Sequence, residues 1–283
     1  MSYLAPSDFM TKAVDAGESK VFMATKDSFI RAYMAGAILA LAAAFAVTIN
    51  QSTGQPLIGA LLFPVGFSMI YLLGYDLFTG VCVLTPLALI DRRPGVTVSN
   101  IARNWVVVFC GNFAGALTLA VLMAIVFTFG FATEPNAVGK FIGGVGEART
   151  LGYEKFGASG MLTLFVRAML CNWMVSTGVI GAMLSTSVPG KVIAMWMPIT
   201  VFFYMTFEHS VVNMFLFPSA ILMGGNLTIM DYLIWNEIPT LIGNIVGGLA
   251  FTGLMLYATH VRTGAKRSPA IEAAAYAKPV AAE

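Results

Sequence analysis

A carboxylate, an imidazole and a carboxamide lie close together in an otherwise apolar part of the sequence: Glu208, His209 and Asn213. Residues 192–207 and 210–230 carry no charged side chain. An ionisable pair is costly at membrane depth, so it is expected to face a cavity or the protein interior. The sequence therefore predicts that this stretch lies at the centre of a transport pathway.

Other side chains that could do chemistry are few. Besides two histidines, the chain has three cysteines, Cys82, Cys110 and Cys171, which lie far apart in apolar surroundings without a CxxC or Cys–His spacing. This pattern indicates neither a zinc site nor a disulfide framework, and we interpret the cysteines as apolar packing residues. The sequence also shows no nucleophile triad and no phosphate-binding loop. We therefore expect no metal, no cofactor and no enzymatic activity.

The composition indicates the environment of these residues. Of 283 residues, 58% are hydrophobic and 11% are charged, and the mean hydropathy is +0.81. Soluble domains carry about 25% charged residues, so the sequence predicts an integral membrane protein. The net charge of +2 gives no reason to expect nucleic acid as a partner.

Long runs without charged side chains predict the membrane spans, because a helix that crosses a bilayer needs about 20 apolar residues. The uncharged run 32–75 is too long for one span, and a polar segment over 48–56 divides it. We expect an all-α protein with six transmembrane helices, near 28–50, from 57 onwards, within 104–133, near 159–186, near 190–224 and near 236–261. Polar, Gly and Pro residues interrupt the second and fifth helices, which we expect to be broken.

The basic residues predict the orientation, since cytoplasmic loops are enriched in Lys and Arg. If both ends lie inside, the basic residues of the cytoplasmic segments are Lys12, Lys20, Lys26, Arg31, Arg92, Arg93, Arg103, Lys191, Arg262, Lys266, Arg267 and Lys278. The outer segments then hold only Lys140, Arg149 and Lys155, together with more acidic residues. Both termini are therefore predicted to be cytoplasmic.

The chain divides into a transmembrane domain over 28–262 and a polar segment at each end. Residues 1–27 lack the apolar region of a signal peptide. Their apolar residues recur at roughly helical spacing, which predicts a short amphipathic helix at the membrane surface, although a frayed polar terminus fits as well. Residues 263–283 are Ala-rich and polar, and we expect a disordered cytoplasmic tail. The Gly-rich segment 134–158 is the longest outer loop and is expected to fold back over the outer mouth.

The two interrupted helices match each other at a constant separation of 132 residues. The matching positions are Asp76 and Glu208, Pro86 and Pro218, Asn104 and Asn236, and the Gly-Asn pairs 111–112 and 243–244. Residues 29–32 (Phe-Ile-Arg-Ala) also match 165–168 (Phe-Val-Arg-Ala). We infer an internal duplication with three spans in each half. Because three is odd, the second repeat is inverted relative to the first, as in many transporters.

Two broken helices have a common physical consequence. The breaks free backbone N–H and C=O groups, which are tolerated at membrane depth only in the protein interior or along a cavity. Each break also directs a half-helix N-terminus, with its partial positive charge, towards the middle of the protein. We expect the breaks to meet at one small polar site suited to an anion. The alternative is a pair of helix kinks without a ligand.

Several segments resemble the formate/nitrite transporters, which are pentameric channels for small monovalent anions. The resembling segments are Asp76-Leu77-Phe78-Thr79, Gly111-Asn112-Phe113-Ala114-Gly115-Ala116, Cys171-Asn172-Trp173-Met174-Val175, Phe207-Glu208-His209-Ser210 with Asn213-Met214-Phe215, and Gly243-Asn244-Ile245-Val246-Gly247-Gly248. They cover both halves of the chain. The resemblance implies an aquaporin-like subunit with its own pore, and five subunits around a central axis.

The resemblance also implies roles for single residues. In this family the loop in the second span presents a threonine to the central histidine, which corresponds here to Thr79 and His209. Asn172 and Asn213 match polar residues near that site, and Lys155 matches the lysine that attracts anions to the outer vestibule. The family's hydrophobic constrictions fall on Phe63, Phe67 and Phe202 at the outer side and on Leu77, Phe78 and Val175 at the inner side.

The two acidic residues are expected to support the site rather than line it. Adjacent helical residues point about 100° apart, so Glu208 and His209 are not expected to line one narrow pore together. We expect His209 to line the pathway and Glu208 to hold it in place. Asp76, the repeat partner of Glu208, is expected to have the same supporting role.

These observations predict a passive or proton-linked formate channel in the bacterial inner membrane. Its expected partners are formate or a similar anion, protons, membrane lipid and further copies of the chain. His209 would either supply a proton or only stabilise the anion. Histidine suits proton transfer because its ordinary pKa lies near 6.5. Nitrite and hydrosulfide are alternatives within the family. A water or neutral-solute channel is more remote, because the chain has no Asn-Pro-Ala motif.

Overall fold

The computed structural model describes residues 3–262, and helices make up its regular structure. The first half contains α1 (Pro6–Phe22), α2 (Thr25–Thr53), α3 (Pro56–Leu62), α4 (Pro64–Leu72), α5 (Phe78–Ile90) and α6 (Val98–Phe127). The second half contains α7 (Ala137–Ala148), α8 (Leu151–Glu154), α9 (Gly157–Met183), α10 (Val188–Tyr204) and α11 (Ser210–Leu222). It ends with a continuous helical run of α12 (Ile229–Tyr232), η1 (Leu233–Glu237), α13 (Ile238–Gly248), η2 (Leu249–Leu254), α14 (Met255–Tyr257) and η3 (Ala258–Arg262).

Four helical runs in the described chain are long and apolar enough to cross a membrane: α2, α6, α9 and the run from Ile229 to Arg262. Four shorter apolar runs lie between them in sequence: α3–α4, α5, α10 and α11. The shorter runs form two pairs, each interrupted by a few non-helical residues, at 73–77 and at 205–209. These interruptions lie in the two regions where the sequence predicts broken helices.

The prolines lie next to the breaks rather than in them. Pro86 and Pro218 are inside α5 and α11, and the helices continue through them. A proline inside a helix removes one backbone hydrogen bond but does not always end the helix. The breaks themselves contain residues with positive φ, Gly74 at 70° and Thr206 at 53°. Positive φ ends a right-handed helix, and for the non-glycine Thr206 it is an uncommon conformation.

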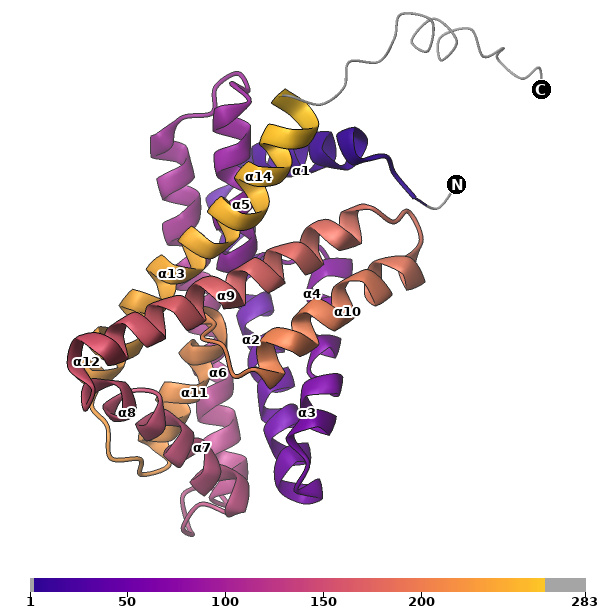
Figure 1. Cartoon of the computed structure of the whole chain (residues 1–283). Coiled ribbons are helices and arrows are strands. Elements are labelled where there is room, and N and C mark those ends of the chain that lie inside the picture. Colours follow the sequence, from indigo (N-terminus) through magenta and orange to yellow (C-terminus); the bar gives the residue numbers. More distant parts are fainter. Residues whose placement is uncertain (1–2, 263–283) are drawn as a thin grey trace, which may run out of the picture.

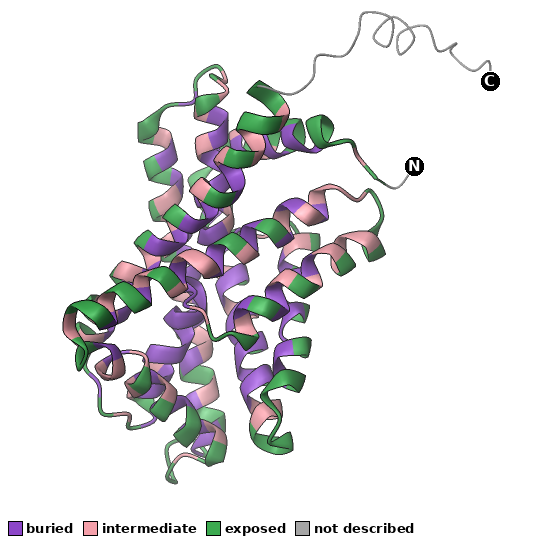
Figure 2. Ribbon diagram, in the orientation of Figure 1, coloured by how far each residue is buried: buried purple, intermediate pink, exposed green. Residues whose placement is uncertain are grey.

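Figure 1 shows α1 and the end of the C-terminal run at one end of the molecule, and α7, α8 and α12 at the opposite end. Phe9 of α1 lies against His260 of η3, with 6.1 Å between the ring centroids. Many of the most buried residues lie in the middle, around α11, which contacts both α2 and α5 (Figure 2). α2 is largely enclosed by other helices, whereas α6 and the C-terminal run keep much of their apolar surface exposed.

Glycines allow the long helices to pack closely in pairs. A Cβ atom at Gly115 of α6 would lie 2.0 Å from the Tyr33 carbonyl oxygen of α2. A Cβ atom at Gly247 of α13 would lie 2.0 Å from the Met169 carbonyl oxygen of α9. Both glycines lie in the small-residue segments noted in the sequence, and small residues at such positions let helix backbones approach each other.

The segments outside the long helices are also helical. α1 occupies the predicted amphipathic segment, and its apolar residues Phe9, Met10, Ala13 and Val14 pack against Leu84, Leu87 and Ile180 of the protein. The segment 134–158, expected as a loop, contains α7 and α8, and α7 packs against α11. The predicted tail 263–283 lies outside the described residues.

Candidate functional site

The two helix breaks meet in the protein interior. Thr79, in the first turn of α5, places its Oγ1 3.3 Å from Nε2 of His209, the N-cap residue of α11. The side chains come from residues 130 positions apart, and both are almost completely buried. The structure thus brings together the threonine and histidine that the family resemblance pairs.

A second contact restricts the hydrogen-bonding state of His209. Its Nδ1 accepts a hydrogen bond from the Val212 backbone N–H at 3.2 Å. An imidazole nitrogen that accepts carries no proton, so the neutral ring carries its proton on Nε2. That N–H points to Thr79 and is available to donate to it or to an anion. A second proton on His209 would break the N-cap hydrogen bond to Val212.

Aromatic rings enclose the histidine on two sides. The Phe202 ring is stacked on His209 with 5.5 Å between centroids, and the Phe67 ring meets it edge-on at 5.6 Å. The two phenylalanines also touch each other at 5.7 Å, and Phe63 lies against both. The imidazole is therefore the polar group inside an aromatic cluster.

Two cavities border this cluster. A cavity of about 370 Å³ is lined by Phe202, Val212 and Arg149 and by polar residues at the end of α2. A cavity of about 180 Å³ is lined by Phe67 and Thr79 and by residues of α1, α4, α5, α9 and α10. His209 contacts one ring of each cavity wall. We name the cavity lined by Arg149 the outer cavity and the cavity lined by Lys20 the inner cavity, after the sides that the sequence predicts for these residues.

The predicted constriction residues divide into two groups. Leu77, Val175 and Phe67 line the inner cavity, and Phe202 lines the outer one. Phe67, which was predicted at the outer side, lines the inner cavity and contacts the histidine. Phe78 is directed elsewhere, since its ring packs against Trp105 and Phe109 at 5.9 Å.

The predicted asparagines hold the site together. Asn172 is fully buried, and its Nδ2 donates to the carbonyl oxygens of Thr79 (3.1 Å) and Asn244 (2.7 Å). Asn213 is also fully buried, and its Nδ2 donates to Glu208 (3.0 Å) and Asn236 (2.6 Å). Both side chains donate to other protein groups around the histidine.

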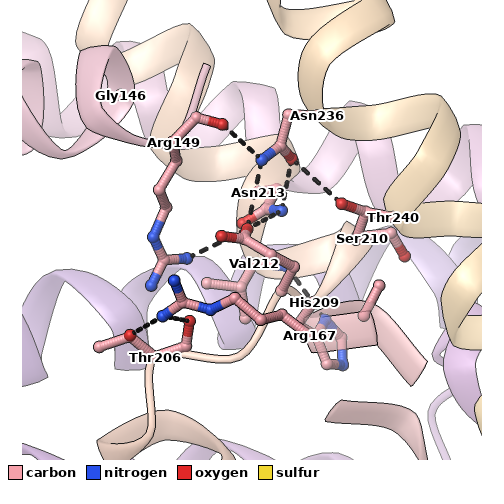
Figure 3. A network of polar contacts seen from close by, with 12 residues as sticks. Gly146, Arg149, Arg167, Thr206, His209, Ser210, Val212, Asn213, Asn236 and Thr240 are labelled. Carbon is pink, nitrogen blue, oxygen red and sulfur yellow. Dashed lines mark hydrogen bonds and ion pairs between the residues drawn. The ribbon is translucent and has the colours of Figure 1, made fainter. Parts of the chain in front are cut away.

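Glu208 is held by side chains from α8, α11 and η1 and from the C-cap of α7. Arg149, Asn213 and Asn236 of this group are labelled in Figure 3. Asn213 and Asn236 donate to its Oε2, and Arg149 lies 3.5 Å from the same oxygen. The Tyr153 hydroxyl donates to Oε1 at 2.8 Å. Burial raises the pKa of Tyr153, and the Glu208 carboxylate raises it further, so the phenol stays a neutral donor. These contacts fit the supporting role expected for Glu208.

Asp76 has a similar but simpler environment. Lys20 of α1 forms an ion pair with Asp76 Oδ1, while Oδ2 is buried without a hydrogen-bond partner. Asn104 donates to the Lys20 carbonyl oxygen, as Asn236 does to the Arg149 carbonyl oxygen. The two acidic residues thus occupy matching positions. Asp76 is paired with Lys20 of α1, and Glu208 is paired with Arg149, the C-cap residue of α7.

Lys155, the predicted outer cation, lines neither of these two cavities. Lys155 is exposed, and its Nζ lies over the Phe156 ring, 4.9 Å from the centroid. Arg149, and not Lys155, lines the outer cavity and contacts Glu208. The repeat contained a signal for Arg149, because Lys20 and Arg149 are 129 residues apart, close to the separation of the acids that they contact.

Comparison with known sequences identifies the family. A sequence profile described as "Formate/nitrite transporter" matches residues 7–258, which is most of the chain. The chain belongs to the formate/nitrite transporter family. Members of this family are membrane transporters and channels, so the membrane-spanning character predicted from the composition is confirmed.

Individual relatives are similar over nearly their whole length. A "Probable formate transporter" of Methanothermobacter thermautotrophicus is 31% identical over 276 residues, which cover 92% of this chain and 98% of the relative. The "Formate channel BtFdhC" of Bacillus thuringiensis is 30% identical over 268 residues, which cover 92% and 97%.

Solved structures share the fold. A "Pentameric formate channel with formate bound" has a TM-score of 0.68 and 24% identity, covering 82% of this chain and 96% of that one. An "FNT family ion channel" has a TM-score of 0.77 and 22% identity, covering 89% and 99%. The all-helical fold predicted from the sequence is thereby confirmed.

Proposed function

We propose that this protein is a channel for formate, with nitrite or hydrosulfide as the alternative substrate of the same pathway. The observation that carries the proposal is the position of His209, which contacts a ring from the wall of each cavity and lies within hydrogen-bond distance of Thr79. Relatives that align over almost the full chain are named formate transporters or channels, which favours formate.

The aromatic cluster is a barrier to the charged substrate. Moving an unpaired carboxylate out of water costs many kcal/mol, and the neutral acid costs far less. A low dielectric between the two cavities would also raise the pKa of the bound acid. We infer that the anion is collected in a cavity, takes up a proton near His209 and passes the phenylalanines in its neutral form.

His209 is proposed to act as a hydrogen-bond donor through Nε2. Its Nδ1 is already occupied by the Val212 N–H, so the neutral ring presents its N–H towards Thr79 and the substrate. This arrangement favours stabilisation of the anion by His209, with the proton arriving through water. Direct proton donation would need a charged ring and would break the N-cap contact.

Arg149 is proposed as the cation that attracts the substrate at the outer side, and Lys20 as its counterpart inside. Both line a cavity next to the aromatic cluster. Each is paired with a buried carboxylate, so an arriving anion competes with Glu208 or Asp76 for the basic group. Lys155 remains the alternative on the outer side.

We also propose the arrangement in the membrane. The six spans are α2, α3–α5, α6, α9, α10–α11 and the run Ile229–Arg262, and the two halves are inverted repeats. Five copies form a ring in the bacterial inner membrane, as in the related structure described as pentameric, and both termini are cytoplasmic.

The function is tested by substrate flux into proteoliposomes that contain the purified protein. Formate, nitrite and hydrosulfide are compared at two pH values, and formate is expected to enter fastest and faster at the lower outside pH. Equal or higher flux of nitrite at both pH values would contradict the formate assignment. No flux of any of the three would contradict the channel proposal itself.

Two substitutions of the histidine separate its possible roles. His209→Phe removes the donor. It is expected to lower formate flux by roughly tenfold or more, because the anion loses a hydrogen bond. His209→Asn keeps an N–H donor that cannot be charged and is expected to retain measurable flux. Equal loss in both variants would contradict the hydrogen-bond role and favour proton transfer by the imidazole.

A further inference from the structure

A third cavity lies beside the outer cavity and has a different chemical character. It has a volume of about 620 Å³ and is bounded by α7, α8, α9 and the break before α11. Its polar lining consists of Arg149, Arg167, Tyr153, Ser159, Thr163 and Thr206. The described residues that line it include two guanidinium groups and four hydroxyls but no carboxylate.

The charges around this cavity are not balanced. Arg149 contacts Glu208 at 3.5 Å. Arg167 donates to the carbonyl oxygens of Met205 and Thr206 and to the Thr206 hydroxyl, which are all uncharged groups. Both arginine side chains line this cavity, and both are drawn in Figure 3. One positive charge thus lacks a carboxylate partner within a membrane-spanning helix, where an unpaired charge is costly.

Other features of the cavity also favour an anion. It lies beside the N-terminus of α9, a helix of 27 residues, whose first N–H groups carry partial positive charge. Lys155 adds a third basic group near the rim, because its Nζ lies over the ring of Phe156, a lining residue. The position of Lys155, which does not line the outer cavity, gains an explanation in this way.

We propose that this cavity binds a divalent oxyanion. Guanidinium groups match the geometry of tetrahedral oxyanions and carboxylates and bind them through paired hydrogen bonds. Glu208 balances the charge of Arg149, but Arg167 and the nearby Lys155 still provide two positive charges. Together with the hydroxyls of Ser159, Thr163 and Thr206, they suit two negative charges better than one. The cavity is also of the size of typical small-molecule sites, far larger than a small monovalent anion requires.

The bound oxyanion would act on transport, and this part rests on the proposed function. Arg149 and Thr206 line both this cavity and the outer cavity. A divalent anion held by Arg167 and Arg149 withdraws Arg149 from the outer cavity, where it would attract the substrate. Occupancy from outside therefore lowers formate entry at low formate concentration.

Binding is tested first, without reference to transport. Sodium sulfate is added to the purified protein in detergent, and the melting temperature is compared with that in sodium chloride of equal ionic strength. A ligand that binds only the folded state raises the melting temperature with its concentration, so we expect an additional, saturating increase with sulfate. Identical curves in both salts would overturn the proposal.

Variants locate the site. Arg167→Gln is expected to weaken sulfate binding roughly tenfold or more, because sulfate loses a charged hydrogen-bond donor. Arg167→Lys keeps the charge and is expected to bind with intermediate strength. Because Arg167 also contacts the helix break, Ser159→Ala with Thr163→Ala is a second variant that leaves those contacts in place. Unchanged sulfate binding in a folded Arg167→Gln protein or in this double variant would place the anion elsewhere.

The effect on transport is measured separately in proteoliposomes. Sulfate outside is expected to reduce formate entry at low formate concentration and to lose this effect in Arg167→Gln. Sulfate binding without inhibition would support the site and overturn its link to transport. If the protein transports no formate, the binding measurement still decides whether the anion site exists.

Discussion

Asn112 and Asn244 are the residues that most directly fix the two helix breaks. Asn112 Nδ2 donates to the carbonyl oxygens of Ala32 (2.8 Å) and Asp76 (2.9 Å), and its Oδ1 accepts from the Phe78 N–H. Asn244 makes the same three contacts one repeat later, with the carbonyl oxygens of Ala168 and Glu208 and with the Ser210 N–H. Each asparagine therefore satisfies backbone groups in a break, at the start of the helix that follows it and on a neighbouring long helix.

Replacing either asparagine is predicted to destabilise the protein. Asn112→Ala and Asn244→Ala would each leave buried backbone groups without partners, and each such group costs about 1–3 kcal/mol. We expect each variant to lose about 3 kcal/mol or more and to show a lower melting temperature in detergent. Asn226→Ala, at an exposed position, is the control and should unfold like the parent protein. A melting temperature like that of the parent protein in both variants would contradict this assignment.

At the scale of elements, the close approach of helices depends on glycines, which carry a hydrogen atom where other residues carry a Cβ atom. Gly115 brings α6 against α2, and Gly247 brings α13 against α9, at distances that leave no room for a methyl group. The nearest atoms are backbone carbonyl oxygens, which cannot move away by changing a rotamer. The helix pairs would have to separate to admit a Cβ atom.

Gly115→Ala and Gly247→Ala are therefore predicted to reduce folding strongly. Overpacking of an interior usually costs about 1–3 kcal/mol, and contact with a rigid backbone is expected to reach or exceed the upper end. The measurement is the fraction of protein that elutes as a single species from a size-exclusion column after heating. Gly144→Ala of α7 is the matched control, since its Cβ atom would meet nothing within 4 Å. Equal recovery of all three variants would show that the helix pairs adapt.

The sequence predicted the elements that depend on local patterns. The breaks and the pairing of Thr79 with His209 followed from polar residues in apolar runs, from the repeat and from the family resemblance. The position of Arg149 depended on α7 and α8, and the Gly-rich segment that contains them lacks a clear helical pattern. Lys155 was assigned from the family resemblance, which does not report where a side chain points. The π-helical stretches η1, η2 and η3 were not predicted, because such stretches have no simple sequence pattern.

At the scale of the whole molecule, the two ends of the described chain lie together. α1 packs against α5 and touches η3, while α7, α8 and α12 lie at the opposite end (Figure 1). An even number of spans, as in the proposed six, puts both termini on the same side of the membrane. The surplus of basic residues in the segments at the α1 end favours the cytoplasm for that side.

Single cysteines test this orientation in bacterial membrane vesicles. Cys110 is exposed and is first replaced by serine, whereas Cys82 and Cys171 are buried and can stay. With a membrane-impermeant maleimide, Gly144→Cys is expected to react only in right-side-out vesicles, and Lys12→Cys only in inverted ones.

Thr259→Cys of η3 is the internal control for the number of spans, because it should react on the same side as Lys12→Cys. If Lys12→Cys and Thr259→Cys reacted on opposite sides, the number of spans would be odd, and the two halves could not be inverted repeats of three spans each. If both reacted only in right-side-out vesicles, the six spans would stand but the orientation would be reversed. Lys20 would then face the outside, and Arg149, with the oxyanion cavity beside it, would face the cytoplasm.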